Sequence, residues 1–269
     1  MILMQLVVNC VRRSVKKRRG DCMETVFMTD RGRIRQHNED NGGVFLNAHG
    51  QVLAIVADGM GGHRAGDVAS AMAVQKLQDV WTSSPAINEP NDATTWIREQ
   101  VMNVNEAIHQ HASEHEECKG MGTTIVLAIC TSEFCTIGNI GDSRGYLFNE
   151  DGFRQITEDH SLVNELVKNG QISREDAEHH PRKNILLRAL GTEEKVDLDV
   201  KTVEIESTDL LLLCSDGLSN KISEEKLQDI LQPGTSLNET GARLITLANE
   251  LGGEDNITLA IVDFTSESG

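Results

Sequence analysis

The sequence predicts an α+β fold in which antiparallel sheets carry helices on their outer faces. Three observations lead to this expectation. Short runs rich in Val, Ile and Leu recur along the chain, bounded by Gly, Asp or Asn, as is typical of buried strands. Longer segments repeat apolar residues at helical spacing. The strand-like runs mostly come in adjacent pairs instead of alternating with helices, which favours antiparallel sheets over a doubly wound parallel sheet.

Six runs have the character of strands, each of them short and flanked by turn residues: 24–28, 52–57, 124–130, 134–140, 209–214 and 257–262. Only Thr131, Ser132 and Glu133 separate the run 124–130 from the run 134–140. A loop of this length is typical of a β-hairpin. We therefore expect these two strands to be antiparallel neighbours.

Helices are expected between these strands. In 94–112, the residues Ile97, Val101, Val104 and Ile108 recur at steps of four, three and four, so they share one helix face. The segments 67–81 and 238–251 have the same pattern. Ser223 precedes a short helical sequence and is a good N-cap residue.

The first 22 residues differ from the rest of the chain. They hold six of the 25 basic residues and one of the 42 acidic residues, so residues 23–269 carry a net charge of −22 against −17 for the whole sequence. Their basic residues follow the apolar stretch, unlike a secretory signal. Either 1–22 is a weak amphipathic anchor, or Met23 is the functional start, which we favour. Without internal repeats or a long linker, 23–269 is expected to form one domain.

The composition excludes several classes of protein. The acidic excess argues against nucleic acid or an anionic membrane as the main partner. No apolar run approaches the roughly 20 residues of a membrane helix, so we expect no stable membrane insertion. The six cysteines form no C-x-x-C pair and no zinc-type spacing with histidine. This usage fits a reducing cytoplasm without disulfides, and we expect a cytoplasmic protein.

Acidic residues stand at the ends of the apolar runs. Asp58 follows 52–57, and the other acids beside such runs are Asp142, Asp216 and Asp255, with Glu39 and Asp40 adjacent to each other elsewhere. Each alone could be an ordinary turn residue, because Asp and Gly dominate turns. Strand ends, however, meet at one edge of a sheet. We therefore expect these acids to share a small volume.

Such a cluster needs positive charge. Two carboxylates about 4 Å apart repel by about 4 kcal/mol at an effective dielectric constant of about 20. Oxygen ligands suit Mg²⁺ or Mn²⁺, and the Gly59 carbonyl could add one more. Two such ions about 3.5–4 Å apart can activate a bridging water, and Arg35 supplies a planar donor for phosphate. The residues therefore indicate phosphoester hydrolysis.

Competing phosphate chemistries lack their signatures. No cysteine is followed by arginine six positions later, which excludes the C-x5-R loop of cysteine-dependent phosphatases. The sequence contains neither G-x-x-x-x-G-K-[ST] nor G-x-G-x-x-G, so ATP or dinucleotide binding is unsupported. The signatures of His-rich dimetal phosphatases are also missing.

Seven ordered motifs resemble those of bacterial members of the protein phosphatase 2C family, which are metal-dependent Ser/Thr phosphatases. The motifs occupy 35–40, 56–63, 120–124, 140–144, 157–160, 214–218 and 252–256. The resemblance runs from about residue 24 to 263. It is strongest to the stand-alone phosphatases that oppose a membrane Ser/Thr kinase in Gram-positive bacteria.

The resemblance implies a four-layer α-β-β-α sandwich of two antiparallel sheets flanked by helices, with a flap insertion at about 160–185 that touches substrate. It also implies a role for each matching acid. Asp58 would bridge two core Mn²⁺ or Mg²⁺ ions, with the Gly59 carbonyl on one of them. Asp216 and Asp255 would bind one core ion. Glu39 would reach the second through water, supported by Asp40.

Two further assignments follow from the same resemblance. Asp142, together with Asp216, matches a weaker third metal site. Arg35 would hold the substrate phosphate.

The resemblance also implies the reaction and the partners. A metal-bridging water would attack phosphoserine or phosphothreonine directly. The implied partners are phosphorylated proteins and a cognate membrane Ser/Thr kinase, without nucleic acid, and we expect a monomer.

Two other classes of protein remain open at this point. A pseudophosphatase would bind phosphoproteins without turnover. It is disfavoured because metal chemistry depends on a complete ligand set, and the five key residues are all present: Arg35, Glu39, Asp58, Asp216 and Asp255. An acidic structural protein would only solvate its carboxylates. It would show no metal-dependent melting shift, whereas a ligand at 100 times its Kd adds about 2.7 kcal/mol.

The chain departs from the pattern at the position of the general acid, because many eukaryotic members have histidine where this chain has Met60. Our hypothesis is that His63 protonates the leaving alkoxide; a metal-bound water is the alternative, and a lone histidine is more often a structural hydrogen-bonding residue. If the hypothesis holds, His63→Ala should lower phosphopeptide turnover and alter the pH–rate profile. An unchanged profile with unchanged turnover would contradict it.

Overall fold

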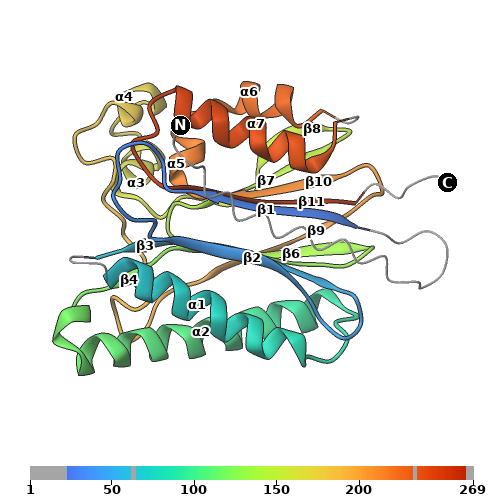
Figure 1. The fold of residues 1–269 in the computed structure, drawn as a ribbon, viewed down its shortest axis with the longest axis horizontal. Helices are drawn as coiled ribbons and strands as arrows, with labels where there is room; N and C mark the ends of the chain where they lie inside the picture. The colour runs from blue at the N-terminus through green and yellow to red at the C-terminus, as the bar shows by residue number, and fades with distance from the viewer. Residues whose placement is uncertain (1–22, 62–64, 233–234, 265–269) are drawn as a thin grey trace.

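The computed structural model describes residues 23–61, 65–232 and 235–264. The basic extension 1–22 and His63 lie outside the described residues. The chain forms four layers, with two sheets packed face to face and helices on both outer sides (Figure 1).

The first sheet has five strands, all antiparallel to their neighbours. In spatial order they are β1 (Glu24–Asp30), β11 (Ile257–Asp263), β10 (Leu210–Cys214), β7 (Arg144–Asn149) and β8 (Gly152–Gln155). The first and last strands of the sequence are therefore direct neighbours.

The second sheet is also antiparallel throughout. Its strands, in spatial order, are β2 (Asp40–Leu46), β3 (Val52–Met60), β5 (Ile125–Cys130), β6 (Phe134–Ile140) and β9 (Asp199–Glu204), and the short β4 (Gly122–Thr123) also pairs with β3. The predicted hairpin is the β5–β6 pair, in which Cys130 faces Cys135.

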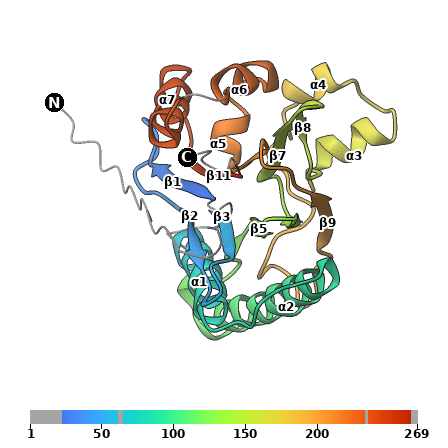
Figure 2. The ribbon, with the colours of Figure 1, turned by 90° about the vertical axis from the view of Figure 1, so that its right-hand side faces the viewer.

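Helices cover the outer faces of both sheets (Figures 1 and 2). The six-stranded sheet carries α1 (Ala65–Thr82) and α2 (Pro90–Glu114), which is followed by the 3₁₀ turn η1 (Glu116–Cys118). The five-stranded sheet carries α5 (Asp216–Ser219), α6 (Glu224–Ile230) and α7 (Leu237–Glu250). This arrangement confirms the expected sandwich.

Two short helices, α3 (Leu162–Lys168) and α4 (Arg174–Glu178), stand at one side of the sandwich, within the segment 160–185 that was expected to be a flap (Figure 2). Within the part of the chain that the structure describes, none of the helices combines the length and hydrophobicity needed to span a bilayer.

The strongly periodic elements were predicted correctly. Ser223 caps α6 as expected, with its hydroxyl accepting from the Lys226 amide at 3.4 Å. The strands β4, β7 and β8 were not predicted, and neither were β2, which begins Asp-Asn-Gly-Gly, and β9, which is a polar edge strand. Both β2 and β9 gain their structure from a neighbouring apolar strand, which a local sequence pattern does not show.

The core explains why several strands are continuous apolar runs. Every residue of β5 and of β10 is buried, because one face of each sheet packs on the other sheet and the opposite face packs under helices. Between the sheets lie small and branched residues: Val56, Ala128, Leu211 and Ala260. Trp81 of α1 and Trp96 of α2 meet edge to face, with ring centroids 5.2 Å apart.

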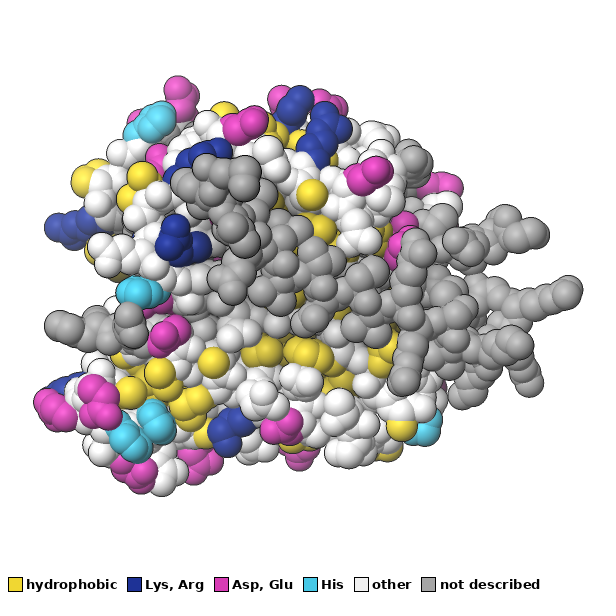
Figure 3. Space-filling view, in the orientation of Figure 1, with side chains coloured by type: hydrophobic (Ala, Val, Ile, Leu, Met, Phe, Trp, Pro, Cys, Tyr) yellow, Lys and Arg dark blue, Asp and Glu magenta, His cyan; other side chains and the backbone are white. Residues whose placement is uncertain are grey.

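Acidic side chains are scattered over both halves of the face shown in Figure 3, with basic side chains among them. The negative charge on this face is therefore not one continuous patch. Acids with a chemical role must be distinguished from these by their burial and by their neighbours.

Two glycines bring the start of α1 against the end of β3. A β-carbon built on Gly59 would lie 2.1 Å from the Gly66 carbonyl oxygen, and one built on Gly66 would lie 2.7 Å from the Gly59 carbonyl carbon. Neither position has room for a side chain. The contact fixes the backbone directly after Asp58.

We expect Gly66→Ala to destabilise the protein, although alanine is favoured over glycine in a helix by about 1 kcal/mol. The new methyl would overlap backbone atoms of Gly59, and overpacking of this kind typically costs about 1–3 kcal/mol. Urea unfolding measures the change. Gly241→Ala in α7 is the matched control, because its nearest atoms would belong to side chains and not to backbone: the end of Met28, at 3.0 and 3.3 Å, and Leu259 Cδ1, at 3.5 Å. An equal effect of both substitutions would contradict the close approach.

Candidate metal centre and active site

Both sheets bring acidic residues to the same end of the sandwich. Asp40 begins β2 and is the direct cross-strand partner of Asp58 in β3. In the other sheet, Asp216 follows β10 as the first residue of α5, and Asp255 stands two residues before β11. Asp142 lies in the turn between β6 and β7. The structure places Asp58 inside its strand, which runs on to Met60, where the sequence suggested a position just beyond the strand.

These five acids form one electrostatic cluster. Burial raises the pKa of Asp58 well above its usual value, and repulsion by Asp40, Asp216, Asp142 and Asp255 adds to this effect. The pKa of Asp40 is raised to about 7 by burial and by the nearby charges of Asp216 and Asp255. Burial, followed by the charge of Asp216, raises the pKa of Asp142 to about 7 as well. The carboxylates are thus close enough to disfavour one another's ionisation.

The backbone of Asp58 is fixed by two neighbouring threonines. Its amide donates to Thr124 Oγ1 at 3.0 Å, and its carbonyl accepts from the Thr124 amide at 2.8 Å and from Thr123 Oγ1 at 2.9 Å. The next amide, of Gly59, donates to the Glu39 carbonyl at 3.1 Å. The Asp58–Gly59 pair therefore has little freedom to move.

Two carboxylates each keep one buried oxygen without a protein partner. Asp40 Oδ2 accepts from Ser215 Oγ at 2.7 Å, and Asp216 Oδ2 accepts from Asn220 Nδ2 at 3.0 Å. Asp40 Oδ1 and Asp216 Oδ1 are buried and have no hydrogen-bond partner. A buried oxygen that is left without a partner costs about 1–3 kcal/mol, so its presence calls for an explanation.

Glu39 and Arg35 complete the cluster from the loop between β1 and β2. The Glu39 amide donates to Asn256 Oδ1 at 2.8 Å, and its carbonyl also accepts from Ser70 Oγ at 2.6 Å. Arg35 Nη2 donates to Asp255 Oδ2 at 2.7 Å, while about half of the Arg35 side chain, 49%, stays exposed. The guanidinium thus borders the acids and faces solvent.

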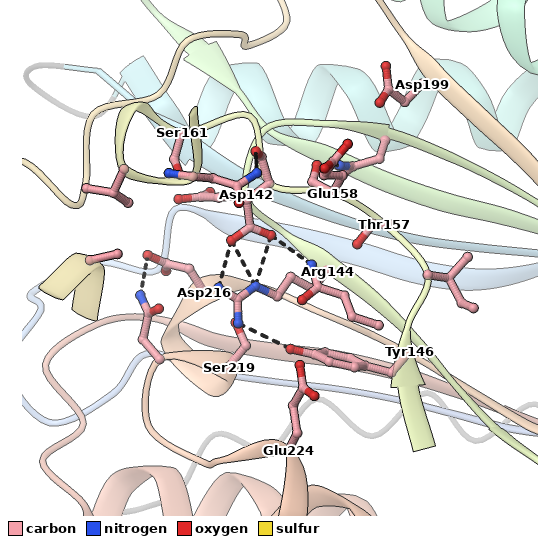
Figure 4. A pocket seen from close by; sticks show the side chains of 18 of the residues that line it. Asp142, Arg144, Tyr146, Thr157, Glu158, Ser161, Asp199, Asp216, Ser219 and Glu224 are labelled. Carbon is pink, nitrogen blue, oxygen red and sulfur yellow. Dashed lines mark hydrogen bonds and ion pairs between the residues drawn. The ribbon is translucent and has the colours of Figure 1, made fainter. Parts of the chain in front are cut away.

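A pocket of about 1450 Å³ opens beside one side of the cluster (Figure 4). Asp142 and Asp216 line it, whereas Arg35, Glu39, Asp58 and Asp255 do not. Another wall comes from the segment 160–185, through residues that include Ser161, Asn164, His179 and Lys183. The pocket joins the acids to this segment.

Arg144 braces the pocket wall. Its Nε and Nη2 donate to the Asp159 carboxylate at 3.0 and 2.7 Å, and its Nη1 donates to Tyr146 Oη at 3.3 Å, a contact visible in Figure 4. The Arg144 and Asp159 side chains are both largely buried. A bidentate pair of this kind holds both partners in a defined orientation.

The residues of the cluster fit divalent cations. Among the residues that the structure describes, no three His, Cys, Asp or Glu side chains already have the geometry of a complete metal-binding site. The oxygen donors are nevertheless of the type that Mg²⁺ and Mn²⁺ prefer. The unpartnered oxygens of Asp40 and Asp216, and the mutual repulsion of the acids, are the features that a bound cation would relieve.

Some supporting residues were not recognised from the sequence as part of the site. Ser215, Thr123, Thr124 and Asn256 hold the acids in place, yet Ser, Thr and Asn are also ordinary turn residues. Only their position in the sequence could have identified them as part of the site, because each stands one residue from a candidate acid or inside one of the seven motifs. His63 lies outside the described residues, so its relation to the cluster stays a prediction.

We expect the metal-free protein to lose stability as the pH rises from about 4 to about 7. Asp40 and Asp142 have pKa values of about 7 in the folded chain, whereas an unfolded Asp titrates near pH 3.9. The folded chain therefore binds more protons in this window, and its free energy of unfolding falls as these are lost. Because one pKa unit corresponds to about 1.4 kcal/mol, the loss should reach at least about 2 kcal/mol.

Urea unfolding at about pH 5 and about pH 7.5, with EDTA and with excess Mn²⁺, measures this effect. Mn²⁺ should reduce the dependence of the free energy of unfolding on pH, because the bound cation would offset the negative charge of the carboxylates. Asp40→Asn should reduce the dependence in EDTA, because the amide cannot ionise but can still accept from Ser215. A free energy of unfolding that does not fall with pH in EDTA would contradict the repulsion.

Known proteins are similar to this chain over most of its length. The profile of the protein phosphatase 2C family matches residues 31–251. The serine/threonine phosphatase Stp of Listeria welshimeri is 54% identical over 241 residues, which cover 90% of this chain and 96% of that relative.

Solved structures share the fold as well. The serine/threonine phosphatase Stp1 from Staphylococcus aureus matches with a TM-score of 0.87 and 36% identity, over 93% of this chain and 98% of that one. The catalytic domain of the phosphatase PstP in complex with two manganese ions matches with a TM-score of 0.78 and 33% identity, over 90% and 97%. This chain belongs to the protein phosphatase 2C family.

Proposed function

We propose that the protein is a metal-dependent phosphatase that hydrolyses phosphoserine and phosphothreonine in proteins. The observation that carries the proposal is the buried acid cluster. Its unpartnered oxygens and raised pKa values support the assignment of a site for hard cations, and the cluster lies between a half-exposed arginine and a large pocket. The relatives named above as serine/threonine phosphatases support the same reaction.

Asp58, the Gly59 carbonyl, Asp216 and Asp255 are the proposed ligands of two core ions, Mn²⁺ or Mg²⁺. Glu39 would contribute to holding the second ion through water, and Asp40 would support the ligands. Bound cations there would lower the pKa of a water molecule and orient it towards phosphorus. The manganese ions in the PstP complex support this assignment.

Asp142 and Asp216 are the proposed holders of a weaker third ion. Both line the pocket, and the charge of Asp216 helps to raise the pKa of Asp142. This position is on the substrate side of the cluster, next to the segment 160–185. That segment is the proposed flap, because it forms a wall of the pocket.

Arg35 is the proposed binding residue for the substrate phosphate. Its contact with Asp255 fixes one edge of the guanidinium, and its exposed part can meet a dianion entering from solvent. A planar guanidinium binds phosphate through paired hydrogen bonds. The leaving alkoxide takes its proton from His63, or from water.

The proposed substrates are phosphoproteins made by a cognate membrane Ser/Thr kinase, together with that kinase itself. The proposed compartment is the cytoplasm, where such a kinase would place its products. The four described cysteines support a reducing environment, because Cys118, Cys130, Cys135 and Cys214 are buried as free thiols.

The experiment is hydrolysis of a phosphothreonine peptide with Mn²⁺, with Mg²⁺ and with EDTA. We expect activity with either ion and none in EDTA. Asp58→Asn should lower kcat/KM by more than the roughly 10- to 100-fold that the loss of an outer-shell partner costs, because Asp58 is at the centre of the cluster. Asp229→Asn is the matched control, since this exposed residue of α6 forms an ion pair with Lys226, at 4.0 Å, and does not belong to the acid cluster.

Two further comparisons sharpen the result. Arg35→Ala should raise KM for the phosphopeptide more than it lowers kcat, because it removes a binding group. A phosphotyrosine peptide should be hydrolysed poorly. Metal-dependent binding of phosphopeptide without turnover would indicate a binding module instead of an enzyme, and full activity in Asp58→Asn would refute the proposed site.

A further inference from the structure

The segment 160–185 joins the fold through a narrow neck. The Leu187 amide donates to the His160 carbonyl at 2.8 Å, and the Leu162 amide donates to the Ile185 carbonyl at 2.9 Å. The two ends of the segment therefore pair like a short antiparallel ladder. The ladder closes the two ends of the segment, and α3 adds contacts of its own, through Asn164 to the Asp159 carbonyl at 2.7 Å and through Lys168 to Glu158 at 2.7 Å.

His160 also holds the turn that carries Asp142. Its amide donates to the Gly141 carbonyl at 2.9 Å, and its Nδ1 accepts from the Gly141 amide at 3.2 Å. Gly141 has a φ of +105°, and a β-carbon there would lie 2.6 Å from Thr124 Cγ2. Both polar groups of this residue are thus fixed by His160, directly before Asp142.

The other ring nitrogen is occupied too. Because Nδ1 accepts from an amide, the neutral ring carries its proton on Nε2. Nε2 is 3.3 Å from Asp199 Oδ2, to which it can donate, and 3.3 Å from Arg188 Nη1, which itself donates to Asp199 Oδ1 at 3.1 Å. Burial lowers the pKa of His160, which favours the neutral form. With 7% exposure, the ring connects the neck, the turn and the start of β9.

On the far side of Asp142, the turn is held by a second contact. Ser143 Oγ lies 2.7 Å from Thr124 Oγ1, and the same Thr124 hydroxyl accepts from the Asp58 amide. The two residues that flank Asp142 are therefore both held by hydrogen bonds. Ser143 is connected through Thr124 to the Asp58 backbone, and Gly141 is connected through His160 to the segment 160–185.

We propose that His160 is a positioning residue that ties the neck of this segment to the Gly141–Asp142 turn and so sets where the Asp142 carboxylate stands in the pocket. The inference rests on the proposed function, because Asp142 matters for turnover only if the pocket serves the phosphatase reaction. A residue that merely filled space would be replaceable by any side chain of similar size.

Three substitutions separate these roles. His160→Asn puts an amide oxygen where Nδ1 stands, so it can still accept from the Gly141 amide. His160→Gln puts its amide near the place of Nε2, and His160→Ala provides no acceptor. A misplacement of about 1 Å can cost about 100-fold in rate. We expect kcat to fall at least about tenfold in His160→Ala and His160→Gln, with KM changed less, and to recover within about threefold in His160→Asn.

A double-mutant cycle tests the route through Asp142. In an Asp142→Asn background, His160→Ala should change kcat by less than about twofold, because residues that act as a unit are not additive. Losses that multiply would overturn the proposal, as would equal activity of the Asn and Gln variants. His49→Ala, an exposed histidine in the β2–β3 turn, is the control and should match the parent protein.

Nitrogen-15 NMR of the whole protein gives a readout that does not need activity. We expect the His160 ring to show an unprotonated Nδ1 and a protonated Nε2, and the Gly141 amide signal to move in His160→Ala but to stay near its position in His160→Asn. A proton on Nδ1 would overturn the proposal. An inactive parent protein with these NMR signals would refute the phosphatase function but leave the His160–Gly141 link intact.

Discussion

Repulsion between buried carboxylates is the constraint on which the rest of this structure depends. Five aspartates from two sheets meet at one end of the sandwich, where burial and mutual charge raise the pKa values of four of them. Left to themselves, such groups would move apart or become protonated. The fold holds the cluster together through neighbouring polar groups. Thr123 and Thr124 fix the backbone of Asp58, Asn256 fixes the amide of Glu39, and the Ser215 hydroxyl donates to the carboxylate of Asp40.

The two-sheet architecture supplies the rigidity that this requires. Asp40 and Asp58 belong to strands of one sheet, and Asp216 and Asp255 each lie two residues outside a strand of the other. Their separation is therefore set by how the sheets pack, through a dry layer of side chains such as Val56, Ala128 and Leu211. Close-packed interiors resist deformation, so the spacing of the acids should change little when the surface of the protein changes.

The sequence predicts the fold and the chemically reactive residues better than it predicts their supports. Continuous apolar runs such as β5 and β10 are recognisable locally, because both of their faces are buried. Asp58, Asp142, Asp216 and Asp255 are recognisable because each stands beside such a run, and Glu39 and Asp40 are recognisable as an adjacent pair of acids. Ser215 and Asn256 are different, since their bonds join residues 175 and 217 positions away along the chain. No local pattern encodes those partners, and the same is true of the contact between His160 and Gly141.

The pairing of β1 with β11 has a consequence for how this domain can be joined to other polypeptides. Glu24 faces Asp263 at one end of the pair, and Asp30 faces Ile257, close to Asp255, at the other. At about 3.3 Å per residue, these ends are roughly 20 Å apart. A domain fused before residue 24 or after residue 263 would therefore emerge side by side with the other terminus, away from the acids. A circular permutation that links these two ends through a short connector would leave the substrate entrance unobstructed.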